Sequence, residues 1–532
     1  MRVRLPFVAT VLAVAVVASV SGCAQGDSDP TPIVVGTNYD IALDPADGTG
    51  LGALDLRDQL YPKLLTTVDG LEFETDLAAK ADFDEADGTL YTVTIPSGLT
   101  FANGDDLTSS DVRFSLERYA DLNFEGPAAD LLSGIESIEN PDPLTIVFHL
   151  VTANDATFPA ALAGPAGYIL DEQVFSADSL TGDDVIIAGA PFAGPSTLEP
   201  VERKPLDIHV VPFDDYAGKR ASLGDDAIDI VRYDDPTSLV SDLRSGKVDV
   251  AFGPIPSADS AVIGDGDKVT TTFAPIPRVQ LLVFDLAAMP FGTATPEANP
   301  TQALAVRQAI ASVLDRDAVV SDTGEAFSAA TGYLPADVGG ASDDALDAYG
   351  DGRGGPDLDA AELALTTAGV ATPVAIDIHS TTAFGSNTAD AFAELMKQLD
   401  DSGLFTVSLK AGDASLADYL TGVTSASFPA YQWVPTDPGV DAADDLQFYA
   451  TGGPLDNGFT AATVDDLLTK QSLEADPAAR AELLKQVQAA LAVPLPAIPL
   501  LQNNRSVYSS NAISGVEISD SGAFDLAALR HG

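Results

Sequence analysis

One short segment places two aromatic rings and a carboxylate around the only tryptophan of the chain. Residues 431–438 read Tyr-Gln-Trp-Val-Pro-Thr-Asp-Pro, so Tyr431, Trp433 and Asp437 are close in sequence. An aromatic face beside a carboxylate can hold an organic ligand that has a cationic or polar end. The same residues also fit a strand that ends in a buried tryptophan, with an aspartate that caps a turn before Pro438. The segment alone leaves both interpretations open.

The residue patterns of common enzymes and metal sites are not found in the sequence. There is no His-Glu-x-x-His motif, no cysteine-based metal spacing and no G-x-S-x-G nucleophile motif. We therefore expect no enzyme, no cofactor and no metal, although 80 acidic residues are too many for a catalytic pair of carboxylates to be excluded by counting. The histidines are far apart in the sequence and read as ordinary surface or strand residues: His149, His209, His379 and His531.

The overall composition indicates a large acidic globular protein. The chain has 532 residues, of which 46% are hydrophobic, and this is enough for two or three domains. Its net charge of −54 argues against nucleic acid as a partner, because phosphate binding needs clusters of Lys and Arg. A single cysteine cannot form an internal disulfide. The acidity is most simply explained by solubility, including solubility in a high-salt habitat.

The only cysteine, Cys23, follows a segment that is typical of an export signal. A short positive head, Met1–Arg4, precedes an apolar run from Leu5 to Val20 that is too short to span a membrane. The residues 20–23, Val-Ser-Gly-Cys, resemble a bacterial lipobox. This resemblance implies that the signal peptide, 1–22, is removed and that Cys23 is lipidated. A secreted soluble protein with an incidental cysteine is the alternative.

The elements that must position the aromatic segment alternate between strands and helices. Asp87-Gly88 predicts a hairpin, and the apolar patch Leu60–Leu65 predicts a short helix with Pro62 in its first turn. This alternation predicts an α/β fold with two lobes joined near residues 280 and 490, and a small-molecule cleft between them. Strands are expected at 33–35, 144–150, 206–211, 227–231, 248–252, 281–284, 376–378 and 405–409, and helices at 238–245, 301–314, 360–368, 388–399, 464–473 and 478–491.

Five segments, in the correct order, resemble the family 5 extracellular solute-binding proteins, which are the peptide- and nickel-binding receptors of ABC importers. Each match is weak alone, but the order is specific and the matches extend over nearly the whole chain after Cys23. The segments are Glu74–Ala78, Asp87–Val112, Leu243–Val250, Val306–Arg316 and Pro499-Leu500.

The resemblance implies an α/β, two-lobed class II periplasmic-binding-protein fold with an extra subdomain and a hinge between the lobes. We expect residues 23–32 to be a lipidated tether, 56–189 to be the extra subdomain of lobe I, and 281–489 to be lobe II. The remainder of lobe I is expected to combine 33–55, 190–280 and 490–532.

The resemblance also implies a function without chemistry on the ligand. We expect a monomeric receptor, anchored by lipid to the extracytoplasmic face of the cell membrane, that binds a small organic solute between its lobes. A peptide is the leading candidate, whereas a nickel chelate, an opine, a sugar and haem stay open. The receptor would deliver its solute to an ABC permease and ATPase. The alternatives are a cell-surface hydrolase with an unrecognised carboxylate site and a solute sensor that does not transport.

The family's ligand motif is altered in this chain. Its peptide receptors carry W-x-x-D-Y-x-x-P, with an aspartate that pairs with a peptide amino terminus. Counted back from the last proline, the position of this acid holds Val434, and only Asp437 could replace it. We expect ligand contacts from Trp433, Asp437 and Tyr431, and from Tyr39 at the end of the first strand. Tyr39 also fits a plain aromatic residue at a strand end.

Overall fold

The computed structural model describes most of the chain from residue 31 onward. The predicted signal peptide, Cys23 and Asp437 lie outside the described residues. The described ranges are 31–48, 51–68, 71–122, 132–199, 207–224, 226–263, 268–323, 326–336, 338–342, 349–353, 355–412, 415–435, 441–453, 457–519 and 522–532.

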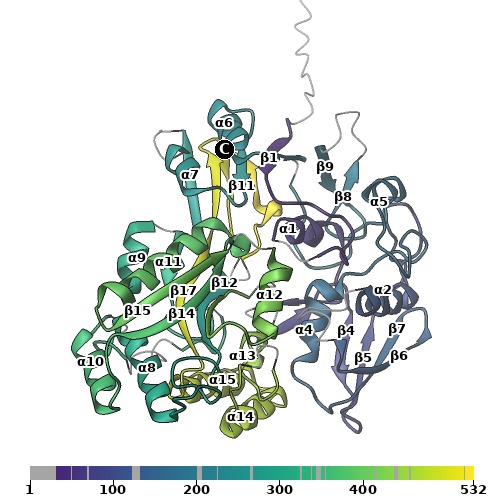
Figure 1. Cartoon of the computed structure of the whole chain (residues 1–532). Coiled ribbons are helices and arrows are strands. Elements are labelled where there is room, and N and C mark those ends of the chain that lie inside the picture. Colours follow the sequence, from purple (N-terminus) through teal and green to yellow (C-terminus); the bar gives the residue numbers. More distant parts are fainter. Residues whose placement is uncertain are drawn as a thin grey trace, which may run out of the picture.

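One large mixed sheet runs through both lobes (Figure 1). Its strand order is β15-β14-β16-β12-β17-β11-β1-β10-β9-β8, and β13 pairs with β17 outside this path. Strands β14 to β16 belong to lobe II, and β1 with β8 to β11 belongs to lobe I. The strands span β1 Ile33–Thr37, β8 Ser196–Glu199, β9 Asp207–Pro212, β10 Ile228–Arg232, β11 Val250–Phe252, β12 Val269–Phe284, β13 Phe327–Ala329, β14 Val374–Thr381, β15 Phe405–Gly412, β16 Ala430–Trp433 and β17 Ala497–Ser510.

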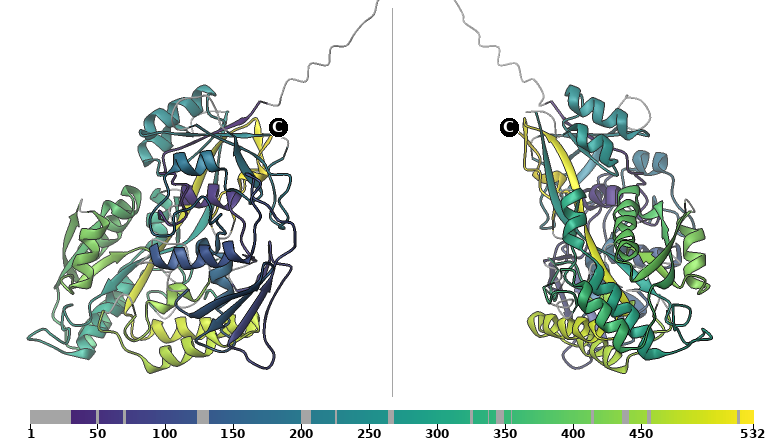
Figure 2. Two further views of the ribbon diagram at one scale, coloured as in Figure 1. Left: turned by 90° about the vertical axis from the view of Figure 1, so that its right-hand side faces the viewer. Right: turned by 60° about the vertical axis from the view of Figure 1, so that its left-hand side comes forward.

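The two lobes are joined by the long antiparallel strands β12 and β17, which run side by side along the molecule (Figure 2). Their register shifts between Pro275 and Val279. Pro275 and Pro277 lack the N–H groups that a regular ladder needs, so the chain bulges here. Because a bulge re-aims side chains, Arg278 leaves the regular pattern of the strand at the crossing between the lobes.

A separate four-stranded sheet with the order β4-β5-β7-β6 lies within residues 56–189, the range that we expected for the extra subdomain and call by that name. The hairpin predicted at Asp87-Gly88 is present, with Phe83 opposite Tyr91 and Lys80 opposite Thr94. Two smaller two-stranded sheets complete the strand inventory of the described residues. The two-stranded sheets are β2-β3 and β18-β19. The strands of all three sheets span β2 Leu65–Thr67, β3 Phe73–Thr75, β4 Lys80–Phe83, β5 Leu90–Thr94, β6 Ile135–Asp142, β7 Thr145–Leu150, β18 Ile513–Ser514 and β19 Arg530–His531.

Local capping signals explain several helix boundaries. Helix α6 begins after Asp235, whose carboxylate accepts hydrogen bonds from the N–H groups of Thr237 and Ser238, and it ends at Gly246 with φ of 77°. The helices are α1 Leu51–Leu60, α2 Ser109–Leu122, α4 Phe158–Ala163, α5 Asp183–Gly189, α6 Pro236–Ser245, α7 Ser257–Ile263, α8 Pro300–Val313, α9 Arg316–Thr323, α10 Leu358–Thr367, α11 Ser386–Asp401, α12 Leu416–Thr424, α13 Asp444–Gln447, α14 Ala462–Ser472 and α15 Pro477–Ala492.

The short helix predicted for residues 60–65 is wrong. Helix α1 ends at Leu60, and the next element is strand β2, which begins at Leu65. Pro62 disfavours the helical conformation of Tyr61 before it, so the chain leaves the helix there instead of starting a new one. Tyr61 is buried and donates a hydrogen bond to the carbonyl of Leu43.

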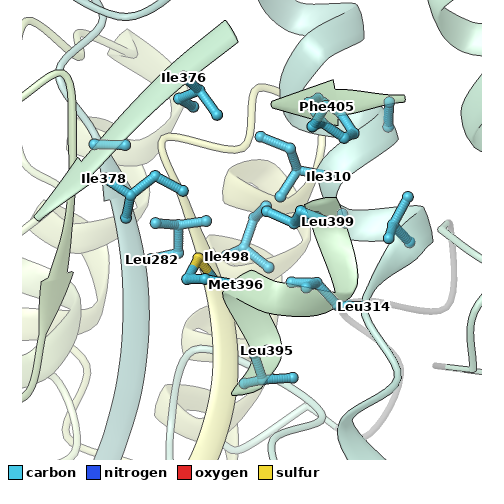
Figure 3. Close-up of a cluster of buried hydrophobic side chains, with 14 of the residues drawn as sticks. Leu282, Ile310, Leu314, Ile376, Ile378, Leu395, Met396, Leu399, Phe405 and Ile498 are labelled. Carbon is cyan, nitrogen blue, oxygen red and sulfur yellow. The ribbon is translucent and has the colours of Figure 1, made fainter. Parts of the chain in front are cut away.

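Lobe II has a core that holds its helices rigidly on the sheet. Leu282 and Ile498 from the crossing strands meet Ile378 of β14 and Met396 of α11 in this cluster (Figure 3). These four side chains, and those of Ile376 and Leu395 nearby, are at most 3% exposed. Since β12 and β17 anchor this core, and β17 also pairs with β11 of lobe I, the two crossing strands couple the lobes mechanically.

Candidate functional site

Tyr431 and Trp433 lie on strand β16 and face the same side of the sheet. They are two residues apart, and they lie opposite Val283 and Leu281 of β12. Tyr431 is only 2% exposed, whereas Trp433 is partly exposed. The Trp433 ring meets Phe384 edge-on at 6.1 Å and Phe448 at 6.0 Å between centroids. Tyr431 is thus largely a core residue, and Trp433 lies at the margin of the core.

The indole N–H of Trp433 is buried without an acceptor among the described residues. A buried tryptophan N–H usually has a hydrogen-bond partner, and leaving it unpaired costs about 1–3 kcal/mol. Such a group is a candidate for a contact with a bound solute.

Tyr39 follows β1 in lobe I and lies near the crossing strands. Its ring packs on Phe252, with 6.1 Å between centroids. Helix α1 passes so closely that a β-carbon on Gly52 would lie 2.4 Å from the β-carbon of Tyr39, so only glycine fits there. The pKa of Tyr39 is raised, because the effect of burial is larger than the opposing effect of the positive charges of Arg505 and Arg278. Tyr39 is therefore a protonated hydroxyl beside two guanidinium groups.

A fully buried ion pair connects α1 to the crossing strand β17. Arg505 Nη1 donates to Asp55 Oδ1 at 2.9 Å, and Arg505 Nη2 pairs with Asp55 Oδ2. The Phe524 N–H also donates to Asp55, at 2.9 Å, and Arg505 lies 5.0 Å from the centroid of Phe252. With side chains at most 3% exposed, this pair holds the Tyr39 region of lobe I against the crossing.

Arg278, in the bulge of β12, connects the surroundings of Tyr39 with lobe II. It lowers the pKa of Tyr39 in lobe I and also that of Asp445 on α13. Burial nevertheless raises the pKa of Asp445 to about 7. The hydroxyl of Tyr449, electrostatically close to Asp445, has no hydrogen-bond partner in the described part of the chain. Tyr39 of lobe I and Asp445 of lobe II therefore both lie within electrostatic range of Arg278.

The structure brings only part of the predicted site together. Tyr431 and Trp433 share a strand, whereas Tyr39 lies in lobe I, where its ring packs on Phe252. The position of Asp437 is not described, so its role stays a prediction. Sequence reasoning missed Arg278 and Asp445. Basic residues are scarce in this chain, 26 of 532, and an arginine directly after Pro275-Ile276-Pro277 and before the expected strand 281–284 was the available signal for Arg278.

Direct contacts also join the lobes away from the crossing. The Ala156 N–H of the extra subdomain donates to the Ser472 carbonyl at the end of α14, at 2.8 Å. Leu71, in the β2–β3 connection, is buried in the same cluster as Tyr431 of lobe II. Asn387 at the start of α11 donates to the carbonyl of Ile255 in lobe I, at 3.5 Å. The described conformation is therefore one in which lobe II touches both lobe I and the extra subdomain.

A polar pocket of about 420 Å³ lies beside the contact between Ala156 and Ser472. It is lined by Thr152 of the extra subdomain and by residues from α13 to α14, including Gln447, Thr451 and Asp465. Asp465 accepts hydrogen bonds from both the N–H and the hydroxyl of Thr451, so its carboxylate is already engaged within the protein.

Among the described residues, neither a metal site nor a membrane span is found. No group of three or more His, Cys, Asp and Glu side chains in these ranges could hold a metal ion. In the same ranges, no helix combines the length and the apolar character that a membrane span requires.

Comparison with known proteins decides the family. A sequence model of the bacterial extracellular solute-binding proteins, family 5 (middle region), matches residues 72–457. The chain belongs to this family. The glutathione-binding protein GsiB of Salmonella paratyphi A is 24% identical to this family 5 chain over 307 residues, which cover 58% of this chain. The match spans 56% of that curated relative's length.

Solved structures confirm the two-lobed α/β fold of this family 5 member. The ABC transporter substrate-binding protein CtaP of Listeria monocytogenes superposes with a TM-score of 0.74 at 19% identity, covering 94% of this chain and 99% of CtaP. The periplasmic binding protein DppA of Helicobacter pylori, in complex with the peptide STSA, superposes with a TM-score of 0.69 at 19% identity. The superposition covers 94% of this chain and 98% of DppA.

Proposed function

We propose that this chain is an extracytoplasmic receptor that holds a small organic solute, above all a peptide, between its two lobes and delivers it to an ABC permease and ATPase. The observation that carries the proposal is a family 5 chain with two lobes joined by crossing strands, in which charged and polar groups of both lobes lie within electrostatic range of Arg278 at the β12 bulge. Tyr39 comes from lobe I, Arg278 and Arg505 from the crossing strands, and Asp445 from lobe II. A solute there would touch both lobes and favour their closure.

A peptide is favoured over the other solutes by two features of similar proteins. One relative is named for glutathione, a small peptide, and one structural neighbour holds a four-residue peptide. Peptides also offer an ammonium group, a carboxylate and amides, which suit a site with both carboxylate and guanidinium groups. We propose further that the protein works as a monomer and does not alter its solute.

Thermal unfolding with defined peptide pools tests this proposal. Purified protein is melted with pools of dipeptides, tripeptides and tetrapeptides, and with the same pools after complete acid hydrolysis to amino acids. We expect at least one intact pool to raise the melting temperature, because a ligand stabilises the folded state by RT ln(1 + [L]/Kd). Loss of the peptide during incubation would favour the hydrolase instead. No shift with any peptide would refute the proposed solute class.

Replacing Trp433 with alanine should weaken solute binding at least about ten-fold, which corresponds to about 1.4 kcal/mol. The variant removes an aromatic surface and an unpaired N–H at the core margin. Trp433→Phe is the matched control, since it keeps one aromatic ring but loses the second ring of the indole together with its N–H. Titration calorimetry with the peptide found above measures the effect. A Trp433→Ala protein that melts far below wild type but binds normally would show that the ring only fills the core.

Cys23→Ser should abolish membrane retention if the predicted lipid anchor exists. Each buried CH₂ of an acyl chain contributes about 0.8 kcal/mol, so two or three chains hold a protein firmly on a bilayer. Fractionation of cells that express each form checks this prediction. We expect the variant in the medium or as the unprocessed precursor, and equal retention of both forms would contradict the anchor.

A further inference from the structure

The polar pocket of about 420 Å³ beside the contact between lobe II and the extra subdomain is separate from the proposed solute site. None of Tyr39, Arg278, Trp433 and Asp445 is among the described residues that line it. Its volume falls within the about 300–1,000 Å³ that small-molecule sites occupy. The pocket is therefore large enough for a second ligand.

The walls of this pocket come from two parts of the molecule. Helix α14 forms the first wall with one face, on which the lining residues recur every three or four positions: Asp465, Leu468, Thr469 and Ser472. The end of α13 and residues 450–451 after it form a second wall. Thr152, just after β7, lines the pocket from the extra subdomain. A ligand in the pocket would thus touch both lobe II and the extra subdomain.

Most hydroxyl groups of this lining already donate their hydrogen within the protein. Thr451 Oγ1 donates to Asp465 Oδ2 at 2.7 Å, and Thr469 Oγ1 donates to the Asp465 carbonyl at 2.8 Å. Ser472 Oγ donates to the Thr469 carbonyl at 3.0 Å. With these hydrogens engaged, the three oxygens offer a ligand only acceptors. The Asp465 carboxylate also keeps acceptor capacity, because Thr451 uses two of its about four lone-pair sites.

Charge and apolar surface complete the chemistry of the pocket. Among the described residues that line it, only Asp465 is charged, and its charge is negative. Helix α14 ends at the pocket with Ser472, so the partial negative charge of a helix C-terminus lies on the same side. Leu468 and Leu473 add apolar surface, and Leu473 is 49% exposed. An acceptor-rich, negative pocket with an apolar wall suits a cation that has several N–H donors and a short alkyl chain.

We propose that this pocket is a second ligand site, which takes a small primary alkylammonium ion and stabilises the contact between lobe II and the extra subdomain. The ammonium group donates to Asp465 and to the hydroxyl oxygens beside it, and the alkyl chain lies against the two leucines. Because Thr152 belongs to the other side of the contact, the bound ion favours the conformation in which the Ala156 N–H donates to the Ser472 carbonyl. The site needs no transported solute to be filled.

Ligand-detected NMR with n-butylammonium measures the binding, and n-butanol is the uncharged probe of similar shape. We expect saturable binding of the ion and none of the alcohol at the same concentration. Asp465→Asn should weaken the binding about five-fold, because the amide keeps the shape of the carboxylate but not its charge. Thr152→Trp, a change at an exposed position, should weaken it too by filling the pocket.

Asp466→Asn is the matched control, because Asp466 pairs with Lys470 on the same helix and does not line the pocket. We expect it to change the binding less than two-fold. Equal weakening by Asp465→Asn and Asp466→Asn would overturn the proposal, since the acidic surface as a whole would then attract the ion. The lack of any saturable binding by wild type would overturn it as well.

Hydrogen exchange at the Ala156 N–H tests whether the ion holds the two parts together. Exchange requires that the hydrogen bond to the Ser472 carbonyl opens, and opening separates the walls of the pocket. At an n-butylammonium concentration of three times Kd, the exchange should be about four-fold slower than with n-butanol, the factor 1 + [L]/Kd for a ligand that binds only the closed form. Unchanged exchange in protein that binds the ion would overturn the bridging role. Both measurements use solute-free protein, so their outcome does not depend on the proposed receptor function.

Discussion

Asp55→Ala should lower the free energy of unfolding by about 3–5 kcal/mol, the cost of leaving one partner of a buried ion pair alone. Arg505 would keep its charge at 3% exposure with no carboxylate to balance it, and the Phe524 N–H would lose its acceptor. Because the pair links α1 to β17, we expect Asp55→Ala also to loosen the packing of lobe I on the crossing strands.

Urea unfolding of three variants tests this result. Asp401→Ala is the control, because Asp401 pairs with Lys397 on the exposed surface of α11 and such pairs contribute only about 0–1 kcal/mol. The double variant Asp55→Ala/Arg505→Met should recover part of the loss, because no unpaired charge remains. A cost below about 1 kcal/mol for Asp55→Ala alone would mean that water or another group already balances Arg505.

A disulfide across the contact between the lobes should trap a bound solute. The hydrogen bond of 2.8 Å between the Ala156 N–H and the Ser472 carbonyl places the two backbones within the about 4.4–6.8 Å between α-carbons that a disulfide spans. Ala156→Cys/Ser472→Cys is made together with Cys23→Ser, which removes the only native thiol. If release requires the lobes to part, oxidation after loading should slow release about 100-fold or more.

Reduction of the same sample provides the control for this trap. Dithiothreitol should restore the release rate of wild type, and Ala156→Cys alone should release the peptide normally under oxidising conditions. Equal release rates from the oxidised and reduced double variant would mean that the solute is not enclosed where the lobes meet.

Local signals account for the elements that were predicted from the sequence. Asp235 and Gly246 delimit α6 because a carboxylate caps N–H groups and glycine accepts a positive φ. Tyr431 and Trp433 are two residues apart in β16 and belong to one hydrophobic cluster, as alternate residues of a strand do. Helix α1 was not predicted because residues 51–60 lack a clear apolar stripe.

The candidate site could not be predicted to the same extent, because it is assembled from distant segments. Tyr39, Arg278, Asp445 and Arg505 come from four places in the chain, and none belongs to a local motif. Asp445 is one of 80 acidic residues, and only its surroundings in the folded chain distinguish it. The role of Arg278 depends on a bulge whose geometry follows from the pairing of β12 with β17, over 200 residues away.

Mass-spectrometric recovery of the solute tests the central claim most directly. Purified protein is incubated with a defined tetrapeptide pool, freed of unbound peptide by gel filtration, and denatured to release what it holds. The account predicts that one or a few peptides are recovered in near-stoichiometric amount and with unchanged mass. Recovery of shortened fragments, or of no peptide from a folded sample, would contradict a receptor that holds its solute unaltered between two lobes.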